Sequence, residues 1–191
     1  MDTEKILDNL TIEHKNYTGA DFKDHVFNNV VFKNCNFTKS NLNDASLFNC
    51  EFTNCNISLI ILDRCKLQNI NFNNCKMIGL SFNKCEKNLL SFNFNNTILQ
   101  LCDFTKLSLK KTSFNESDLK DVNFSNTDLT EASFLKANLQ GTLFNQCNLT
   151  KADFRKAKNY IIDPRINVIK KAKFSIPEVM DLLKVFEIEI S

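Results

Sequence analysis

Residues 99–154 read LQLCDFTKLSLKKTSFNESDLKDVNFSNTDLTEASFLKANLQGTLFNQCNLTKADF, and every fifth position of this stretch is Phe or Leu. The same spacing runs from Tyr17 to Phe82, where Ile57 and Met77 each take one position of the series. Neither an α-helix nor a simple strand places one apolar residue at every fifth position. A strict short period is typical of a solenoid, in which each repeat buries its apolar residue by stacking on its neighbours.

The overall charge gives no reason to expect direct binding to nucleic acid. The chain has 191 residues, with 24 basic and 22 acidic side chains and a formal net charge of +2. The N-terminus reads MDTEKILDNL and lacks the apolar segment of a signal peptide. No run of about 18 apolar residues is present to span a bilayer. We therefore expect a cytoplasmic protein that does not bind membranes.

A small residue precedes many of the Phe or Leu centres by two positions, which is the strand spacing that points both side chains inward. The chain has eight Cys, and all of them occupy this small position: Cys35, Cys50, Cys55, Cys65, Cys75, Cys85, Cys102 and Cys147. We interpret them as small buried apolar side chains, because the spacing of a closed zinc site is absent. The last two positions of each repeat are often Asn, which tolerates left-handed turns and suits a corner.

The segments NLTKADF at 148–154 and SDLKDVNF at 117–124 closely match the A(D/N)LXX motif, and the chain resembles the pentapeptide-repeat family over about residues 15–157. The resemblance implies an all-β fold, a right-handed quadrilateral parallel β-helix with four repeats per coil. About seven coils would form a rod roughly 35 Å long. We assign residues 1–157 to this β-helix, with an N-terminal cap at about 1–14.

Four repeats per coil also predict how the core is filled between Leu99 and Phe154, where Phe and Leu alternate. Phe residues 20 positions apart would stack on one wall, and a second set would stack on the opposite wall, while Leu fills the other two walls. The predicted columns are Phe104, Phe124 and Phe144 on one wall and Phe114, Phe134 and Phe154 on the other.

The repeat is interrupted between residues 83 and 98, because 17 residues separate the centres Phe82 and Leu99, two more than three repeats need. The first register would place Lys87 at a buried centre, and the second would place Phe92 at a small inward position. We therefore predict a bulge or short loop that exposes Lys87 and Asn88. Such a loop can be a binding element, or an insertion that the solenoid tolerates without a partner.

Residues 158–191 lack the period and are predicted to form a C-terminal module of a short helix and a strand. Ser175 and Glu178 have the spacing of a capping box, and the residues from Phe186 to Ile190 alternate as in a strand. The module can cover the open end of the solenoid or join two copies in a homodimer. The predicted dimer interface comprises Val179, Leu182, Leu183, Phe186, Ile188 and Ile190.

This C-terminal region, with IDPRIN at 162–167, a short helix and an apolar end, is similar to that of the gyrase-protecting members of the family, the Qnr-type and microcin-immunity proteins. The resemblance implies a protein that binds DNA gyrase or topoisomerase IV, partly by resembling duplex DNA. A rod of roughly 35 Å would need about 20 negative charges for full mimicry, so a net charge of +2 leaves only a limited acidic patch. The candidate partner-binding residues are Lys87, Asn88, Glu116, Asp118, Asp121, Asp128 and Glu131.

We expect no enzymatic activity and no cofactor or metal. His14 and His25 are the only imidazoles, and no arrangement of Ser, His and Asp, phosphate loop or paired buried carboxylates can be assembled. The predicted function is binding to a topoisomerase, with protection against quinolones or a peptide toxin. The alternative is a rigid scaffold or adaptor for another protein partner.

Overall fold

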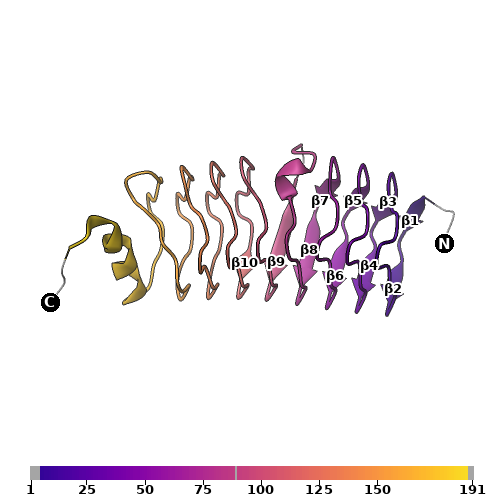
Figure 1. Cartoon of the computed structure of the whole chain (residues 1–191), viewed down its shortest axis with the longest axis horizontal. Coiled ribbons are helices and arrows are strands. Elements are labelled where there is room, and N and C mark those ends of the chain that lie inside the picture. The colour runs from indigo at the N-terminus through magenta and orange to yellow at the C-terminus, as the bar shows by residue number, and fades with distance from the viewer. Residues whose placement is uncertain (1–4, 89, 189–191) are drawn as a thin grey trace.

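The computed structural model describes residues 5–88 and 90–188, which form an elongated stack of coils with a short helix at its C-terminal end (Figure 1). The regular elements are short. The strands are β1 (Ile6–Asp8), β2 (Thr11–Glu13), β3 (Val26–Asn28), β4 (Val31–Lys33), β5 (Ser46–Phe48), β6 (Glu51–Thr53), β7 (Lys66–Gln68), β8 (Ile70–Asn73), β9 (Phe92–Asn95) and β10 (Phe114–Asn115). Two 3₁₀ helices are η1 (Phe82–Lys84) and η2 (Glu178–Phe186).

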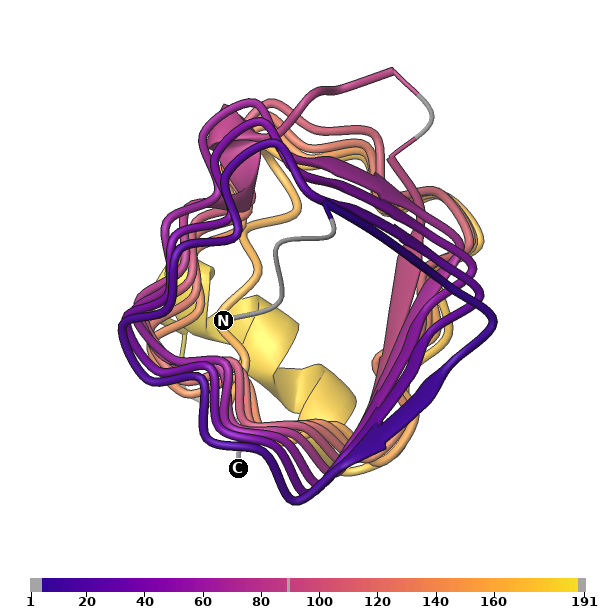
Figure 2. The ribbon, with the colours of Figure 1, turned by 90° about the vertical axis from the view of Figure 1, so that its right-hand side faces the viewer.

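All the strand pairs are parallel, and they form two sheets with the orders β1-β3-β5-β7 and β10-β9-β8-β6-β4-β2. Ile6 pairs with Val26, and single bridges such as Asn123 with Leu143 continue the same step elsewhere. A view along the axis shows a four-sided coil (Figure 2). The predicted quadrilateral parallel β-helix is therefore confirmed.

The four sides of the coil are named here in chain order. Wall 1 contains the sheet of β1, and wall 2 contains the sheet of β2. Wall 3 follows the bridges from Asn36 through Ile98, and wall 4 follows those from Asn41 through Asp103. Walls 1 and 3 face each other across the core, as do walls 2 and 4.

The stack continues beyond residues 15–157 at both ends. At the N-terminal end, β1 and β2 pair with the next coil, so residues within the expected cap at 1–14 are already part of the solenoid. At the C-terminal end, Asp153 pairs with Lys173. The number of coils therefore differs from the predicted seven.

Stacked Phe rings fill two opposite walls, and the predicted columns are confirmed. On wall 2 the rings stack at centroid distances of 4.8–5.4 Å with planes within 22°, along the series Phe32, Phe52, Phe72, Phe94, Phe114, Phe134, Phe154 and Phe174. On wall 4, Phe82, Phe104, Phe124 and Phe144 stack at 4.5–5.5 Å. The two columns meet edge to face, as Phe114 and Phe124 do at 5.4 Å. Each pair contributes about 0.5–1.5 kcal/mol beyond its buried area.

The corners between walls require left-handed backbone. Almost every repeat has a residue with positive φ there, such as Asn29 at 53° and Asn74 at 54°. Asn accepts this conformation more readily than other non-Gly residues because its side chain bonds locally. Asn side chains also bond each other at the same corner of successive coils, as from Asn69 to Asn49 at 2.9 Å. Lys, Glu, Asp and other residues adopt the same conformation at many of the remaining corners, so a chain with only three Gly can still turn repeatedly.

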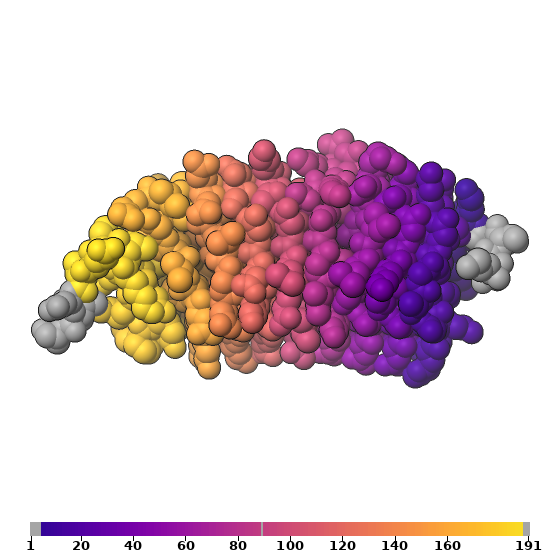
Figure 3. All heavy atoms as spheres, in the orientation of Figure 1, coloured from indigo at the N-terminus to yellow at the C-terminus, as the bar shows by residue number. Residues whose placement is uncertain are grey.

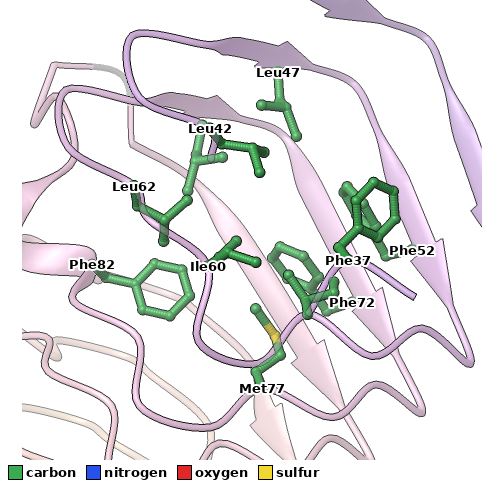
Figure 4. Close-up of a pocket in the computed structure, with 11 residues that line it drawn as sticks. Phe37, Leu42, Leu47, Phe52, Ile60, Leu62, Phe72, Met77 and Phe82 are labelled. Atoms are coloured by element: carbon green, nitrogen blue, oxygen red, sulfur yellow. The ribbon is translucent and has the colours of Figure 1, made fainter. Parts of the chain in front are cut away.

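The core is less completely filled in the coils between Phe37 and Phe82. Walls 1 and 4 carry aliphatic side chains there, including Leu47 and Leu62, instead of rings. A narrow apolar void remains in the core beside these side chains, with Phe52 and Phe72 on its other side (Figure 4). The void lies within the core and is lined entirely by apolar side chains, so it offers no group for catalysis.

Replacement of Phe114 by Ala should lower the free energy of unfolding by about 3–5 kcal/mol, because the ring is fully buried between Phe94 and Phe134. Guanidinium denaturation followed by circular dichroism measures the loss. Phe48→Ala is the matched control, since Phe48 lies at the end of β5 and is only partly buried. Equal losses in the two variants would contradict the role assigned to the stacked column.

Candidate protein-binding surface

A loop interrupts wall 1 between β7 and the later coils. The main-chain N–H of Glu86 donates to the carbonyl of Cys65 at 2.9 Å, and that of Ser91 donates to Leu67 at 3.0 Å. The chain thus leaves the coil after Glu86 and rejoins it at Ser91. Lys87 and Asn88 lie between these points with exposed side chains, as the sequence predicted. The loop stands off the four-sided outline in the axial view (Figure 2).

The loop accounts for the two additional residues in the repeat. Before it, paired residues are 20 positions apart, and across it the partners are 22 apart, as for Phe72 and Phe94. Among the described residues of the loop, Leu90 packs against the core. Phe92 packs at the neighbouring corner and contacts the rings of Phe82 at 5.3 Å and Phe94 at 5.1 Å. A large ring thus occupies a position that is small in most other repeats.

The five candidate carboxylates do not form one patch. Asp128 points outward on wall 1, and Glu131 lies at the corner of walls 1 and 2. Asp118 lies on wall 3, between Glu116 at its corner with wall 2 and Asp121 at its corner with wall 4. The structure thus brings the first two to the same wall as Lys87 and Asn88, and places the other three around the opposite wall.

Lysines neutralise three of these carboxylates. Lys136 bonds Glu116 at 2.7 Å, Lys151 bonds Glu131 at 2.9 Å, and Lys110 lies 3.2 Å from Asp128. The hydrogen bond from Lys151 holds the pKa of Glu131 below its usual range. Burial tends to raise the pKa of Asp128, but bonds from Thr130 and Lys110 outweigh it and leave that pKa lowered. The charges of these three carboxylates are therefore locally compensated by lysines.

Asp118 and Asp121 differ from the other three, because neither forms an ion pair with a described residue. The carboxylate of Asp118 accepts hydrogen bonds from Gln100 at 2.6 Å and Asn138 at 2.9 Å. Asp121 is exposed at its corner. Wall 3 therefore carries the negative charge that remains of the predicted acidic patch.

The C-terminal module covers the end of the solenoid with η2. Leu182 packs against the core, and Val179 and Leu183 are half-buried. Beneath the helix, burial raises the pKa of Tyr160 to about 12, and the carboxylates of Asp181 and Glu178 add to this shift. The module is a lid whose inner face is fitted to the last coil.

The outer face of the lid is apolar and uncovered. Phe186 and Ile188 are 45% and 56% exposed, and Met180 is 41% exposed. The guanidinium of Arg165 lies 5.5 Å from the centre of the Phe186 ring. The predicted interface residues therefore divide between the two faces of the lid, and Ile190 lies outside the described residues.

Two local predictions for this module differ from the structure. The capping box is absent, because η2 has no side-chain cap and the Ser175 hydroxyl instead accepts a bond from the main-chain N–H of Lys156 at 3.0 Å. The helix also includes Phe186, and Glu187 follows it in left-handed conformation. The predicted strand therefore does not begin at Phe186.

The cysteines and histidines are placed as structural side chains. All eight Cys are unpaired and buried, and the Sγ of Cys147 donates to the carbonyl of Phe124 at 3.0 Å. His25 lies at a small inward position with its ring 5.5 Å from Phe22, and His14 is exposed at a corner. Within residues 5–88 and 90–188, no group of three or more His, Cys, Asp or Glu side chains could hold a metal ion.

The same described part of the chain contains no helix that is long and apolar enough to cross a membrane. The space-filling view shows the described chain as a continuous rod from the first coils to the lid (Figure 3). The exposed surface of the rod consists of its four walls and its ends.

The comparisons assign the family. A family model described as pentapeptide repeat region matches residues 25–97 and 81–154 of this chain. The chain therefore belongs to the pentapeptide-repeat family. No curated protein matches by sequence.

Solved structures of QnrB1, a plasmid-mediated fluoroquinolone resistance protein, share the fold. A trypsin-treated variant of QnrB1 matches at 16% identity and a TM-score of 0.65, over 97% of this chain and 100% of that one. Full-length QnrB1 matches at 17% identity and a TM-score of 0.51, over 93% and 100%. At these identities the likeness shows the fold alone.

The buried thiols should resist modification in the native protein. Burial raises the pKa of Cys85 and of Cys102 to about 12, so about one such thiol in ten thousand is ionised at pH 8. Ellman's reagent should react with few thiols in buffer and with all eight in guanidinium chloride. Rapid reaction of several thiols in buffer would contradict the sealed core.

Proposed function

We propose that this protein binds a type II topoisomerase, DNA gyrase or topoisomerase IV, and protects it against quinolones or a peptide toxin. The observation that carries the proposal is the presence, on one rod, of a projecting loop on wall 1 and a lidded end with an apolar outer face. QnrB1 has this fold and is described as a fluoroquinolone resistance protein. We extend that description to this chain and propose that it also protects a topoisomerase.

Wall 1 supplies the proposed contact surface. Lys87 and Asn88 project from the loop, and Asp128 and Glu131 belong to a later coil at the same side of the rod. Coils are about 4.8 Å apart, so one partner can touch the loop and both carboxylates. Wall 3, with Glu116, Asp118 and Asp121, offers a second surface on the opposite side.

Mimicry of DNA is limited in this proposal to a small part of the surface. Duplex DNA presents one negative charge per about 1.7 Å, whereas Lys110, Lys136 and Lys151 compensate three of the candidate carboxylates. Asp118 and Asp121 on wall 3 remain without ion pairs among the described residues. Shape and the loop would therefore contribute more to recognition than a continuous acidic column.

The test is a supercoiling assay with purified gyrase and a fluoroquinolone. The protein should restore supercoiling at equimolar amounts, and Lys87→Ala/Asn88→Ala should weaken protection about tenfold, the effect of a loss of roughly 1–2 kcal/mol of contacts. Lys23→Ala/Asn145→Ala is the matched control, since both residues are exposed on wall 4.

Lack of any protection by the wild-type protein over a wide titration would overturn the topoisomerase proposal and leave the rigid scaffold or adaptor as the function. The same titration with topoisomerase IV covers the second enzyme. Equal loss in the loop and control variants would reject the loop as the contact element.

The uncovered face of the lid supports a homodimer joined at the C-terminal ends. Met180, Phe186 and Ile188 expose apolar surface there, and a self-complementary patch on both copies suits a two-fold dimer. Light scattering should give the mass of a dimer for the wild type. Met180→Glu/Ile188→Glu should give a monomer, because association would bury the two new carboxylates in the interface. The variant should still fold, because the buried face of η2 is left intact.

Leu143→Glu is the control for the dimer, since Leu143 is 49% exposed on wall 4, away from the lid. A monomeric wild-type protein, or a dimer that persists in the Met180→Glu/Ile188→Glu variant, would exclude this interface.

A further inference from the structure

The basic residues of the chain are concentrated in its last coil. Residues 151–174 carry eight basic and two acidic side chains, whereas the rest of the chain carries 16 basic and 20 acidic ones. The net charge of +2 therefore combines a strongly basic segment with a weakly acidic remainder. The expectation that the protein would not bind nucleic acid rested on the balance of basic and acidic side chains over the whole chain. That balance does not describe the C-terminal end of the rod.

The fold gathers several of these cations around an open groove on wall 2. The groove is lined by Glu131, Ser133, Lys151, Asp153, Lys171 and Lys173, and is called here the basic groove. Lys151 and Lys171 occupy the same corner position on successive coils. Lys173 lies beside Asp153 across one coil step. Three lysines thus line one shallow surface that extends over neighbouring coils.

Other groups already compensate both carboxylates of the basic groove. Asp153 accepts bonds from the guanidinium of Arg155, the shortest at 2.6 Å, and this holds its pKa below the usual range. Glu131 is bonded by Lys151 at 2.9 Å and lies 4.0 Å from Lys111. Lys171 and Lys173 are exposed and have no ion pair with a described residue. The basic groove therefore has a positive charge that the chain itself does not neutralise.

Further exposed cations surround the basic groove. Lys170 is adjacent to Lys171 in the chain, and Lys156 lies at the other corner of wall 2 next to Arg155. Neither Lys170 nor Lys156 has an ion pair among the described residues. The positive surface thus extends across wall 2 from one corner to the other.

We propose that the basic groove and its flanking lysines bind the phosphate backbone of double-stranded DNA without regard to sequence. None of the residues lining the groove is apolar, whereas a specific protein interface has a buried apolar centre. Positive charge alone is sufficient for non-specific binding to duplex DNA, because lysines that neutralise phosphates release the counterions condensed on the DNA. Lysine acts as a point charge on phosphate and does not read bases in this arrangement.

The proposal goes beyond topoisomerase binding and does not depend on it. The basic groove is on wall 2 of the last coils and shares Glu131 with the proposed wall 1 surface, whose loop lies on an earlier coil. A protein with both surfaces would hold duplex DNA at one end and a protein partner along its side.

Fluorescence anisotropy with a labelled 20-base-pair duplex of arbitrary sequence tests the proposal on the full-length protein without any topoisomerase. Four phosphate contacts predict a slope of about −3.6 in log K against log salt, or a loss of about 150-fold in affinity between 50 and 200 mM NaCl. Lys171→Glu/Lys173→Glu should reduce the affinity for the duplex at least tenfold. It should also make the slope less negative, by the equivalent of about two phosphate contacts.

Lys66→Glu/Lys76→Glu is the matched control, because it makes the same change in net charge with exposed lysines of earlier coils on walls 1 and 3. Its affinity should remain within about threefold of the wild type, and thermal unfolding checks that both variants are folded. Equal loss in the two variants would overturn the proposal, since binding would then follow net charge alone. Absence of DNA binding at 50 mM NaCl, with or without binding to polyglutamate as a mimic of an acidic protein, would also overturn it.

Discussion

Ring stacking between successive coils is the interaction on which the remaining structure depends. Phe114 contacts Phe94 and Phe134 at 5.4 and 5.0 Å, close to the spacing of paired parallel strands. The main-chain bonds and the rings therefore repeat with the same step, and each coil closes the core of the one before it. Because a single coil cannot bury its own centres, the stack needs a lid at its end, and η2 supplies Leu182 for that purpose.

The same constraint explains how the rod tolerates its interruption. The inserted segment interrupts wall 1 of one coil, where the neighbouring rings must still be covered. Phe92 packs against the ring of Phe82 from the adjacent corner, and Leu90 packs against the core. Lys87 and Asn88 are exposed and project from the wall. A regular solenoid thereby gains a distinct feature without losing the stack on either side.

Charge is distributed around the rod by the coil geometry. Residues 20 positions apart become neighbours, so Glu131 meets both Lys111 and Lys151, and Glu116 meets Lys136. This pairing removes the acidic character that a linear reading of residues 116–131 indicates. Lys171 and Lys173 have no ion pair with a described residue. The end of the solenoid therefore carries uncompensated positive charge, whereas wall 3 carries uncompensated negative charge at Asp118 and Asp121.

The period, the inward position of every Cys and the facing columns of Phe could all be predicted from the amino-acid sequence, because each follows from spacing along the chain. The interruption near Lys87 could be located as well, since two extra residues cannot fit a fivefold repeat. The packing of Phe92 against Phe82 and the placement of Asp118 and Asp128 on opposite walls became visible only in the folded chain. Likewise, Ser175 bonds Lys156 instead of capping η2, although its spacing to Glu178 is that of a capping box. The physical reason is that hydrogen bonds and ion pairs form with the nearest group in space, and in a solenoid that group belongs to the next coil.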